Sequence, residues 1–298
     1  MMTVRLEGKP VADRIDEVTR SEIQSLPAGE APPCLASVHR GVESPFRYYL
    51  KRQAKAASAL GIRFRDEALR PDDGQGELVS LLSALDQDPN VHAVLLEHPL
   101  PPPFDFYRAV AALRPAKDVD GVGIANLGRL VAQMPMQVPA VALAAVEIAR
   151  HYELPISGEP VVVLGRSETV GLPLALLLTG KGIGLNATVT VVHSQSRDLK
   201  QALANARTIF SCVGRPGLLT REVVPEGAHV VDVGISTVSD PAHPGNSRMV
   251  GDADFANLDG WAAGVTPVPG GVGPVTVATL MSNTVQAQSL LRAEDEQR

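Results

Sequence analysis

The sequence of 298 residues lacks the features that mark membrane and nucleic-acid-binding proteins. No uninterrupted apolar stretch approaches the roughly 20 residues that span a bilayer, and residues 1–10 lack the apolar core of a signal peptide. Aromatic residues make up only 4% of the chain, and the formal net charge is −6 without any basic run. Stacking platforms and phosphate-backbone binding are therefore not expected. We expect a cytoplasmic protein that binds neither nucleic acid nor membrane.

Cysteine is also scarce. Cys34 and Cys212 lie far apart in apolar segments, which favours buried thiols of a reducing compartment over a disulfide. Hydrophobic residues, by contrast, reach 45%, enough for a globular core. Because an ordinary domain has roughly 150 residues, the chain length predicts two domains.

Segments typical of strands and helices alternate along the whole chain. Alternation of this kind predicts an α/β fold with mainly parallel sheets. A C-terminal helix follows a Pro/Gly-rich loop within residues 265–289 and is expected to return to the first domain. The expected strands are 34–38, 62–68, 91–96, 161–164, 187–192, 208–212 and 229–233, and the expected helices include 11–26, 44–60 (capped by Ser44, with Pro45 in its first turn), 76–85 and 170–178.

A glycine-containing turn follows the apolar strand 161–164. Gly165, Arg166 and Ser167 come next, and Gly171 stands where a helix is expected to begin. Free N–H groups at a helix N-terminus favour an anion, and glycine lets the backbone approach a pyrophosphate. The spacing is G-x-S-x-x-x-G rather than G-x-G-x-x-G. By itself the turn is thus compatible with nucleotide binding or with a plain tight connection.

The strand after this turn has no acidic residue at its end. It runs into residues 193–197, which read His-Ser-Gln-Ser-Arg. A carboxylate at this place would bind the ribose 2′-hydroxyl of NAD, whereas serine and arginine suit the 2′-phosphate of NADP. Arg166, Ser194 and Arg197 are therefore candidate NADP selectors. Arg197 is equally compatible with a solvated charge at a helix start, and His193 with a structural role.

Several motifs together resemble the bifunctional methylenetetrahydrofolate dehydrogenase/cyclohydrolase family. They occur in the family's order over nearly the whole chain. The most specific are the Pro/Gly block 266–274 and the Lys-Asp-Val-Asp-Gly block 117–121. The others are Gly165–Ser167 with Val170 and Gly171, Asp232–Ile235, Gly251 with Asp252, and Asn126–Arg129.

The resemblance implies a fold, an activity and an assembly. It implies an N-terminal α/β folate-side catalytic domain, residues 1–138 and 272–298, and a C-terminal Rossmann-type NADP-binding domain, residues 139–271. Family members are usually homodimers with the folate in the cleft between these domains. They transfer a hydride from 5,10-methylenetetrahydrofolate to NADP+ and then add water to the methenyl cation. No metal is required in the usual bacterial form.

The family's functional residues can be carried over one by one. Tyr49 matches the active-site tyrosine, and Asp120 matches the acid that contacts the pterin-like ring. The loop around Gly270 and Gly271, with Pro269, matches a substrate-side segment. On the cofactor side the matching residues are Gly165, Arg166 and Ser167 for the phosphates, Ser194 for the 2′-phosphate and Ile235 for the nicotinamide.

The chain departs from the family at its catalytic lysine. The pattern is Tyr-x-x-x-Lys, and counting back from a glycine aligns Tyr49 and places Gln53 at the lysine position. Lys51 and Lys55 lie two positions away, which at about 100° per residue directs them to the far side of the helix. Aligning Tyr48 instead places an arginine there, so neither register restores a lysine.

Other departures lie nearby. Glu97 replaces the family's glutamine, Phe46 replaces a serine, and 139–142 read Pro-Ala-Val-Ala instead of Pro-Cys-Thr-Pro. Because Gln53 cannot transfer a proton, cyclohydrolase activity is predicted to be weak or lost, while hydride transfer survives and Glu97 favours the cation. The alternatives are retained water addition with Glu97 as the base, an NADP-dependent oxidoreductase with a non-folate substrate, and a non-catalytic nucleotide-binding paralogue.

Overall fold

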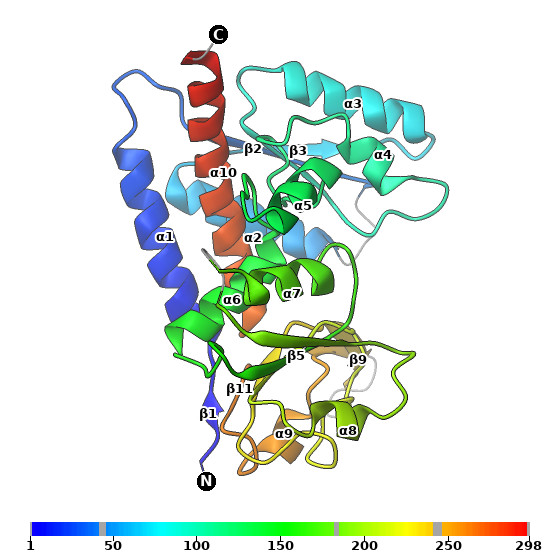
Figure 1. The fold of residues 1–298 in the computed structure, drawn as a ribbon. Coiled ribbons are helices and arrows are strands. Elements are labelled where there is room, and N and C mark those ends of the chain that lie inside the picture. The colour runs from blue at the N-terminus through cyan, green and yellow to red at the C-terminus, as the bar shows by residue number, and fades with distance from the viewer. Residues whose placement is uncertain (1, 42–45, 182–184, 241–245, 297–298) are drawn as a thin grey trace. The chain divides into compact units, whose positions relative to one another are not determined.

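The computed structural model describes residues 2–41, 46–181, 185–240 and 246–296 (Figure 1). The chain divides into two compact units. We call residues 13–140 and 277–298 the three-strand unit and residues 1–12 and 141–276 the six-strand unit, after their main sheets. The main sheet of each unit is parallel, as the alternation of strands and helices predicts.

The three-strand unit is built around a buried parallel sheet in the order β3-β2-β4. All six residues of β2 are buried, so its sequence is mostly apolar rather than alternating, with Ser37 and His39 as its two polar members. The strands are β2 (Cys34–His39), β3 (Arg63–Ala68) and β4 (Ala93–Leu96), and the helices are α2 (Phe46–Leu60), α3 (Gln75–Gln87), α4 (Phe106–Val110) and α5 (Ile124–Val131).

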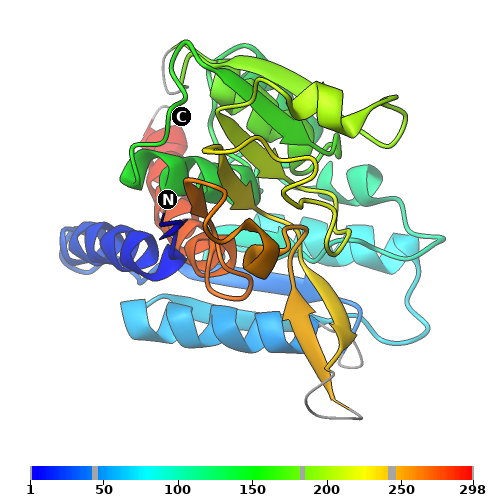
Figure 2. The ribbon, with the colours of Figure 1, turned by 90° about the horizontal axis from the view of Figure 1, so that it is seen from below.

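The long C-terminal helix α10 (Val272–Glu296) completes this unit, as predicted. Its residues Leu280, Met281 and Val285 belong to one buried cluster with Leu35 of β2 and Ala93 of β4. α1 (Gly8–Gln24) runs beside α10 (Figures 1 and 2). Burial of these apolar side chains, at about 25 cal/mol per Å² of apolar surface, holds α10 against the sheet of this unit.

The six-strand unit has the strand order β1-β11-β8-β7-β5-β6. From β5 the chain moves to β6 on one side and then to β7 on the other, so the crossing direction reverses at β5. Its elements are β1 (Val4–Arg5), α6 (Ala140–His151, which begins in the other unit), β5 (Pro160–Leu164), α7 (Gly171–Thr179), β6 (Thr188–Val192), α8 (Leu199–Leu203), β7 (Thr208–Ser211), β8 (His229–Asp232), β9 (Ser236–Ser239), β10 (Ser247–Val250), α9 (Phe255–Leu258) and β11 (Gly264–Val265).

Two features of this unit differ from the sequence-based expectations. The family resemblance places residues 1–138 in the folate-side domain, but Val4 and Arg5 pair with Gly264 and Val265 at the edge of the six-stranded sheet. A strand of two residues, both exposed, carries no periodic signal, so only the pairing partner reveals it. The antiparallel hairpin β9–β10 was also missed; Figure 2 shows it in gold, extending from the sheet.

Other expectations fall outside the described part of the chain. Ser44 and Pro45, expected to begin the second helix, lie outside it, as do the side chains of Phe46 and Tyr48. Among the described residues, no helix combines the length and apolar character needed to cross a bilayer.

Candidate active site

Gln53 and Glu97 form a buried pair in the three-strand unit. Gln53 lies on α2 and is 0% exposed, and Glu97, 6% exposed, directly follows β4. Gln53 Nε2 donates a hydrogen bond of 3.2 Å to Glu97 Oε1. Burial raises the pKa of the Glu97 carboxyl, while donors on Gln53 and Ser37 oppose that rise. The two departures from the family pattern thus contact each other directly.

Tyr49 lies one helical turn before Gln53. Burial is the main cause that raises its pKa, followed by the carboxylates of Asp120 and Glu97, while a hydrogen bond with Gln53 acts in the opposite direction. Lys51 and Lys55 are exposed, as helical geometry predicts from their position two residues either side of buried Gln53. The structure therefore brings Tyr49, Gln53, Glu97 and Asp120 together without a lysine among them.

The Lys-Asp-Val-Asp-Gly motif builds the loop that carries Asp120. Lys117 is 1% exposed and its Nζ donates to the carbonyl oxygens of Leu85, Asp86 and Asp88 at 3.1, 2.7 and 2.8 Å, at the C-terminal end of α3. Asp118 Oδ2 accepts from the Gly123 amide at 2.8 Å and from Asn126 Nδ2 at 2.9 Å. These residues hold the loop in place, a role that sequence reasoning did not assign to them.

Asp120 itself is partly buried beside this scaffold. Burial, then the nearby Asp118 carboxylate, raise the pKa of Asp120 to about 8, against a hydrogen bond from the Ala140 amide. At neutral pH its carboxyl is therefore largely protonated in the free protein. A protonated carboxyl both donates and accepts hydrogen bonds, which suits a heterocycle edge that carries both kinds of group.

In the six-strand unit, the turn after β5 is closed by two glycines. Gly165 has φ +105°, and a Cβ there would lie 2.7 Å from the carbonyl oxygen of Cys212. A Cβ on Gly171 would overlap the carbonyl oxygen of Gly165. Ser167 Oγ accepts hydrogen bonds from the amides of Val170 and Gly171 at 3.2 and 3.3 Å, at the start of α7. The backbone of this turn is so closely packed that neither position has room for a side chain.

The candidate cofactor-selecting residues lie at the same edge of the sheet. Arg166 follows β5, and Ser194 and Arg197 follow β6; the side chains of all three are exposed. Within the described residues, neither arginine forms a hydrogen bond or an ion pair. His193 Nδ1 accepts from the Gln195 amide at 3.2 Å, a local turn contact that fits the structural reading of this histidine. Parallel strands end together here, where α/β sheets bind ligands near a reversal of strand order.

Asp232 and Asp252, both buried, organise the loops after β7 and β8. Asp252 accepts from Ser211 Oγ at 2.6 Å and from the amides of Val213 and Arg215 at 2.9 and 2.6 Å. Asp232 accepts from two further backbone amides at 3.0 and 2.7 Å. Burial raises the pKa of Asp232 to about 6, an effect that these donors limit. The motifs 232–235 and 251–252 thus fix loop backbone.

Glycine at 234 and 251 follows from this arrangement. A Cβ on Gly234 would overlap the Asp252 carboxylate, and a Cβ on Gly251 would overlap the Asp232 carboxylate. Ile235, the residue expected on the nicotinamide side, comes next along the chain and is 56% exposed. The carboxylates of Asp232 and Asp252 therefore fix the loop backbone next to Ile235.

The Pro/Gly block 266–274 packs against the start of the chain. Gly8 donates to the Gly270 carbonyl oxygen at 2.8 Å, and a Cβ on Gly8 would overlap the Gly271 carbonyl oxygen. A Cβ on Gly271 would lie 2.7 Å from the Pro267 carbonyl oxygen. Pro269 and Gly270 are exposed, and Gly270 has φ +113°. Sequence reasoning missed Gly8, whose need for glycine arises from a segment more than 260 positions away.

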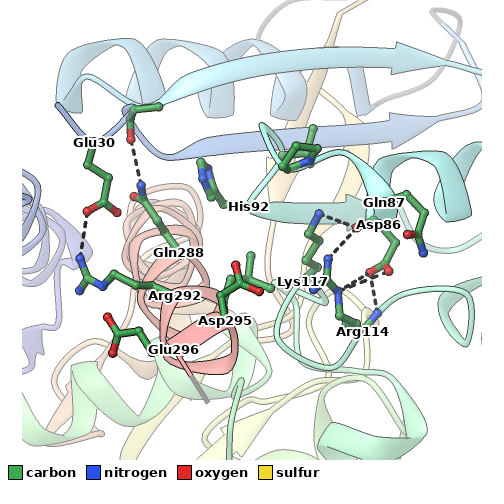
Figure 3. Close-up of a pocket in the computed structure, with 14 residues that line it drawn as sticks. Glu30, Asp86, Gln87, His92, Arg114, Lys117, Gln288, Arg292, Asp295 and Glu296 are labelled. Carbon is green, nitrogen blue, oxygen red and sulfur yellow. Dashed lines mark hydrogen bonds and ion pairs between the residues drawn. The ribbon is translucent and has the colours of Figure 1, made fainter. Parts of the chain in front are cut away.

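A separate hollow of about 860 Å³ lies in the three-strand unit where its strands begin (Figure 3). Its cations are already matched by carboxylates or carbonyls: Arg292 Nη1 contacts Glu30 at 2.9 Å, and Arg114 contacts Asp86 at 3.4 Å. Lys117 points its amine to the end of α3. No group of three or more His, Cys, Asp or Glu side chains in the described part of the chain is arranged to hold a metal ion.

Comparison with known proteins covers both units. Residues 6–120 match the catalytic domain, and residues 139–292 the NAD(P)-binding domain, of tetrahydrofolate dehydrogenase/cyclohydrolase. The bifunctional protein FolD of Desulfovibrio desulfuricans is 40% identical over 95% of this chain and 97% of its own length. FolD of Campylobacter concisus is 37% identical, over 95% and 96% of the two chains.

Two solved structures are similar to this chain over nearly its whole length. The 5,10-methylenetetrahydrofolate dehydrogenase of the silkworm Bombyx mori superposes with a TM-score of 0.91 at 34% identity, covering 98% of this chain and 100% of its own. The methylenetetrahydrofolate dehydrogenase-cyclohydrolase of Trypanosoma brucei, solved with NADP cofactor and an inhibitor, has the same score and identity over 98% and 99% of the two chains. Matches over both units and at this identity establish that the chain belongs to the tetrahydrofolate dehydrogenase/cyclohydrolase family.

Proposed function

We propose that this protein oxidises 5,10-methylenetetrahydrofolate to 5,10-methenyltetrahydrofolate with NADP+ and that its cyclohydrolase activity is weak or lost. The first part rests on family membership over 95% of the chain and on the two-glycine turn after β5. The second rests on one observation, the buried Gln53 amide in the position of the family lysine, hydrogen-bonded to Glu97.

The residues after β5 and β6 fit a nicotinamide dinucleotide with a 2′-phosphate. In this proposal Gly165, Arg166 and Ser167 hold the pyrophosphate at the start of α7. Ser194 holds the 2′-phosphate, and Arg166 and Arg197 have no carboxylate partner among the described residues that would compete with it. Ile235 lies on the nicotinamide side. When bound, NADP+ supplies the hydride acceptor.

On the substrate side, Asp120 binds the amino-pyrimidine edge of the pterin and Tyr49 orients the folate ring. The raised pKa of Asp120 favours this, because a protonated carboxyl presents a donor and an acceptor together. Pro269, Gly270 and Gly271 provide substrate-side backbone. Hydride removal needs orientation rather than proton transfer, since the C–H electron pair leaves with the hydrogen and the folate nitrogens share the positive charge.

Water addition to the methenyl cation places another demand on the site. A proton must leave the attacking water, and general acid–base help is typically worth about 10²–10⁴-fold. The Gln53 amide does not titrate at neutral pH, and Lys51 and Lys55 point to the other side of α2. Cyclohydrolase activity should therefore lie well below dehydrogenase activity.

The test is a coupled assay on the purified protein with 5,10-methylenetetrahydrofolate and NADP+. NADPH formation with accumulation of the methenyl product is expected. Rapid consumption of added methenyl substrate would contradict the loss of cyclohydrolase and point to Glu97 as a base. Tight NADP+ binding without NADPH formation would contradict the dehydrogenase assignment. In Gln53→Lys, recovered hydrolysis would identify residue 53 as the cause.

A second candidate function is an NADP-dependent oxidoreductase with a non-folate substrate. The Gln53–Glu97 pair favours it, because this buried carboxyl alters the charge of the substrate side. Calorimetry with a tetrahydrofolate analogue and with NADP+ separately distinguishes the two, since only a folate enzyme binds both. A protein that binds only nucleotide and turns nothing over would instead be a regulator. We also expect a homodimer, which light scattering can test.

A further inference from the structure

Ser37 places a hydroxyl in the middle of a buried strand. It lies on β2, is 0% exposed, and its neighbours in the chain, Ala36 and Val38, are equally buried. A buried hydroxyl is costly unless it is hydrogen-bonded. Its partner is Glu97: Ser37 Oγ donates to Glu97 Oε1 at 3.2 Å. Ser37 therefore meets the same carboxyl group as Gln53.

Both donors meet the same oxygen of that carboxyl. Gln53 Nε2 also lies 3.2 Å from Glu97 Oε1, whereas Oε2 accepts no hydrogen bond from a described residue. A carboxylate held through one oxygen by two donors on different elements has a defined orientation. Its second oxygen keeps its full capacity to interact with a positive group outside the protein.

We propose that Ser37 is a positioning residue of the active site, which together with Gln53 holds Glu97 so that its free oxygen, Oε2, stabilises the cation formed by hydride removal. This inference rests on the proposed dehydrogenase activity. The positive charge arises when the methylene C–H bond breaks and its electron pair leaves with the hydrogen, and no proton is released in that step. A fixed charge aimed at developing charge is worth more than a mobile one, because it needs no reorganisation.

The groups around Glu97 decide when it is charged. Burial raises the pKa of Glu97, and hydrogen bonds from Gln53 and Ser37, together with His39 at the end of β2, lower it. His39 in turn contacts Asp66 on β3 at 2.6 Å. The nearby Asp120 carboxyl and the Tyr49 hydroxyl also interact with Glu97. Loss of the Ser37 hydroxyl must therefore raise the pKa of Glu97 further and extend its protonated form to higher pH.

The first experiment compares dehydrogenase pH profiles of the wild type and Ser37→Ala. Activity should fall on the acid side as Glu97 is protonated, and in Ser37→Ala this limb should move to higher pH, with kcat near neutral pH reduced about tenfold. Ser58→Ala, an exposed serine on α2, is the matched control and should behave as the wild type. An unshifted acid limb in Ser37→Ala would overturn the inference while leaving the dehydrogenase assignment intact.

A double-mutant cycle separates positioning from packing. In the Glu97→Gln background, which has no ionisable group at this place, Ser37→Ala should have little further effect on kcat. An equal loss in both backgrounds would mean that Ser37 is merely structural and would contradict the proposal.

A measurement independent of turnover completes the test. Carbon-13 NMR of glutamate-labelled protein, assigned with Glu97→Gln, follows the Glu97 carboxyl directly. Its pKa should lie higher in Ser37→Ala than in the wild type, and an unchanged pKa would refute the positioning role. This result holds even for a protein that proves inactive on methylenetetrahydrofolate, so failure of the inference and failure of the proposed function remain distinguishable.

Discussion

The two units of this protein organise their candidate sites by different physics. In the six-strand unit, glycines at 165, 171, 234 and 251 stand where a Cβ would meet backbone or carboxylate, and the oxygens of Asp232 and Asp252 are all occupied by donors. In the three-strand unit, Glu97 Oε2 accepts no hydrogen bond from a described residue, and Gln53 Oε1 is buried without a partner among them.

The difference between a constraint of space and a constraint of protonation determines which substitutions each site can accept. Where space is the constraint, almost any substitution breaks the local backbone, so the motif either persists or the loop is lost. Where protonation is the constraint, a side chain of similar size can replace another while the chemistry changes. In the proposed alignment, Gln53 and Glu97 take the positions of the family's lysine and glutamine. The hydrogen-bonded pair is then kept, but its titratable side chain follows β4 instead of lying on α2.

The largest effect is expected from a substitution in the closely packed turn after β5 of the six-strand unit. In Gly171→Ala, the new methyl group meets the Gly165 carbonyl oxygen, so the turn after β5 must open. We expect a loss of about 3 kcal/mol in stability or NADP+ binding free energy, roughly a hundredfold or more in affinity. Thermal unfolding and calorimetry measure both. Gly128→Ala, on α5 with nothing near its Cβ position, is the control and should retain binding. Unimpaired NADP+ affinity in Gly171→Ala would contradict the steric reading.

The next largest effect is expected from the loss of the buried Lys117 amine in the three-strand unit. Lys117→Met leaves three buried carbonyl oxygens at the end of α3 without their donor. We expect destabilisation by about 2 kcal/mol, measured by urea unfolding. Lys55→Met, at an exposed position of α2, should stay within about 0.5 kcal/mol of the wild type. Equal stabilities of the two variants would mean that the Lys117 contacts contribute nothing.

A smaller effect is expected from substitution of Arg197, a candidate for selecting NADP+ over NAD+. Arg197→Ala removes an exposed guanidinium without breaking any contact within the described chain, so only binding of a 2′-phosphate should suffer. Affinity for NADP+ should fall about tenfold, near 1.4 kcal/mol, with NAD+ affinity unchanged. Arg20→Ala, exposed on α1, should change neither. Parallel losses for both cofactors would contradict a selective role.

A further effect concerns the pH dependence of stability and Asp120. Its folded-state pKa of about 8 lies above the ordinary 3.8, so the folded protein binds the extra proton between these values. Stability from this group is therefore present at low pH and declines as pH rises through that window. Asp120→Asn should remove this decline, giving a flatter dependence of Tm on pH. Asp72→Asn, at an exposed position, should leave the wild-type slope, and an identical slope for Asp120→Asn would exclude the raised pKa.

Much of the fold was predictable because it depends on local periodicity. The apolar runs at 34–38, 91–96 and 161–164 overlap observed strands, and the predicted C-terminal helix does join the three-strand unit. β1 and the β9–β10 hairpin were not predictable: β1 has only two residues, both exposed, and β9 and β10 lack the buried apolar run that marks the equally short β4, β7 and β8. β1 in addition exists only through its pairing with β11, near the other end of the chain.

The candidate site divides in the same way. The sequence by itself determined the family, the glycine turn after residue 164 and the absence of a lysine at position 53, because these depend on residue identity and spacing along one segment. Only the tertiary structure decided that Gln53 donates to Glu97, that Ser37 holds the same oxygen, and that Gly8 must be small to pass Gly271. Each of those facts joins segments distant in the chain, and the energy of a hydrogen bond or a steric overlap depends on distances that exist only once the chain has folded.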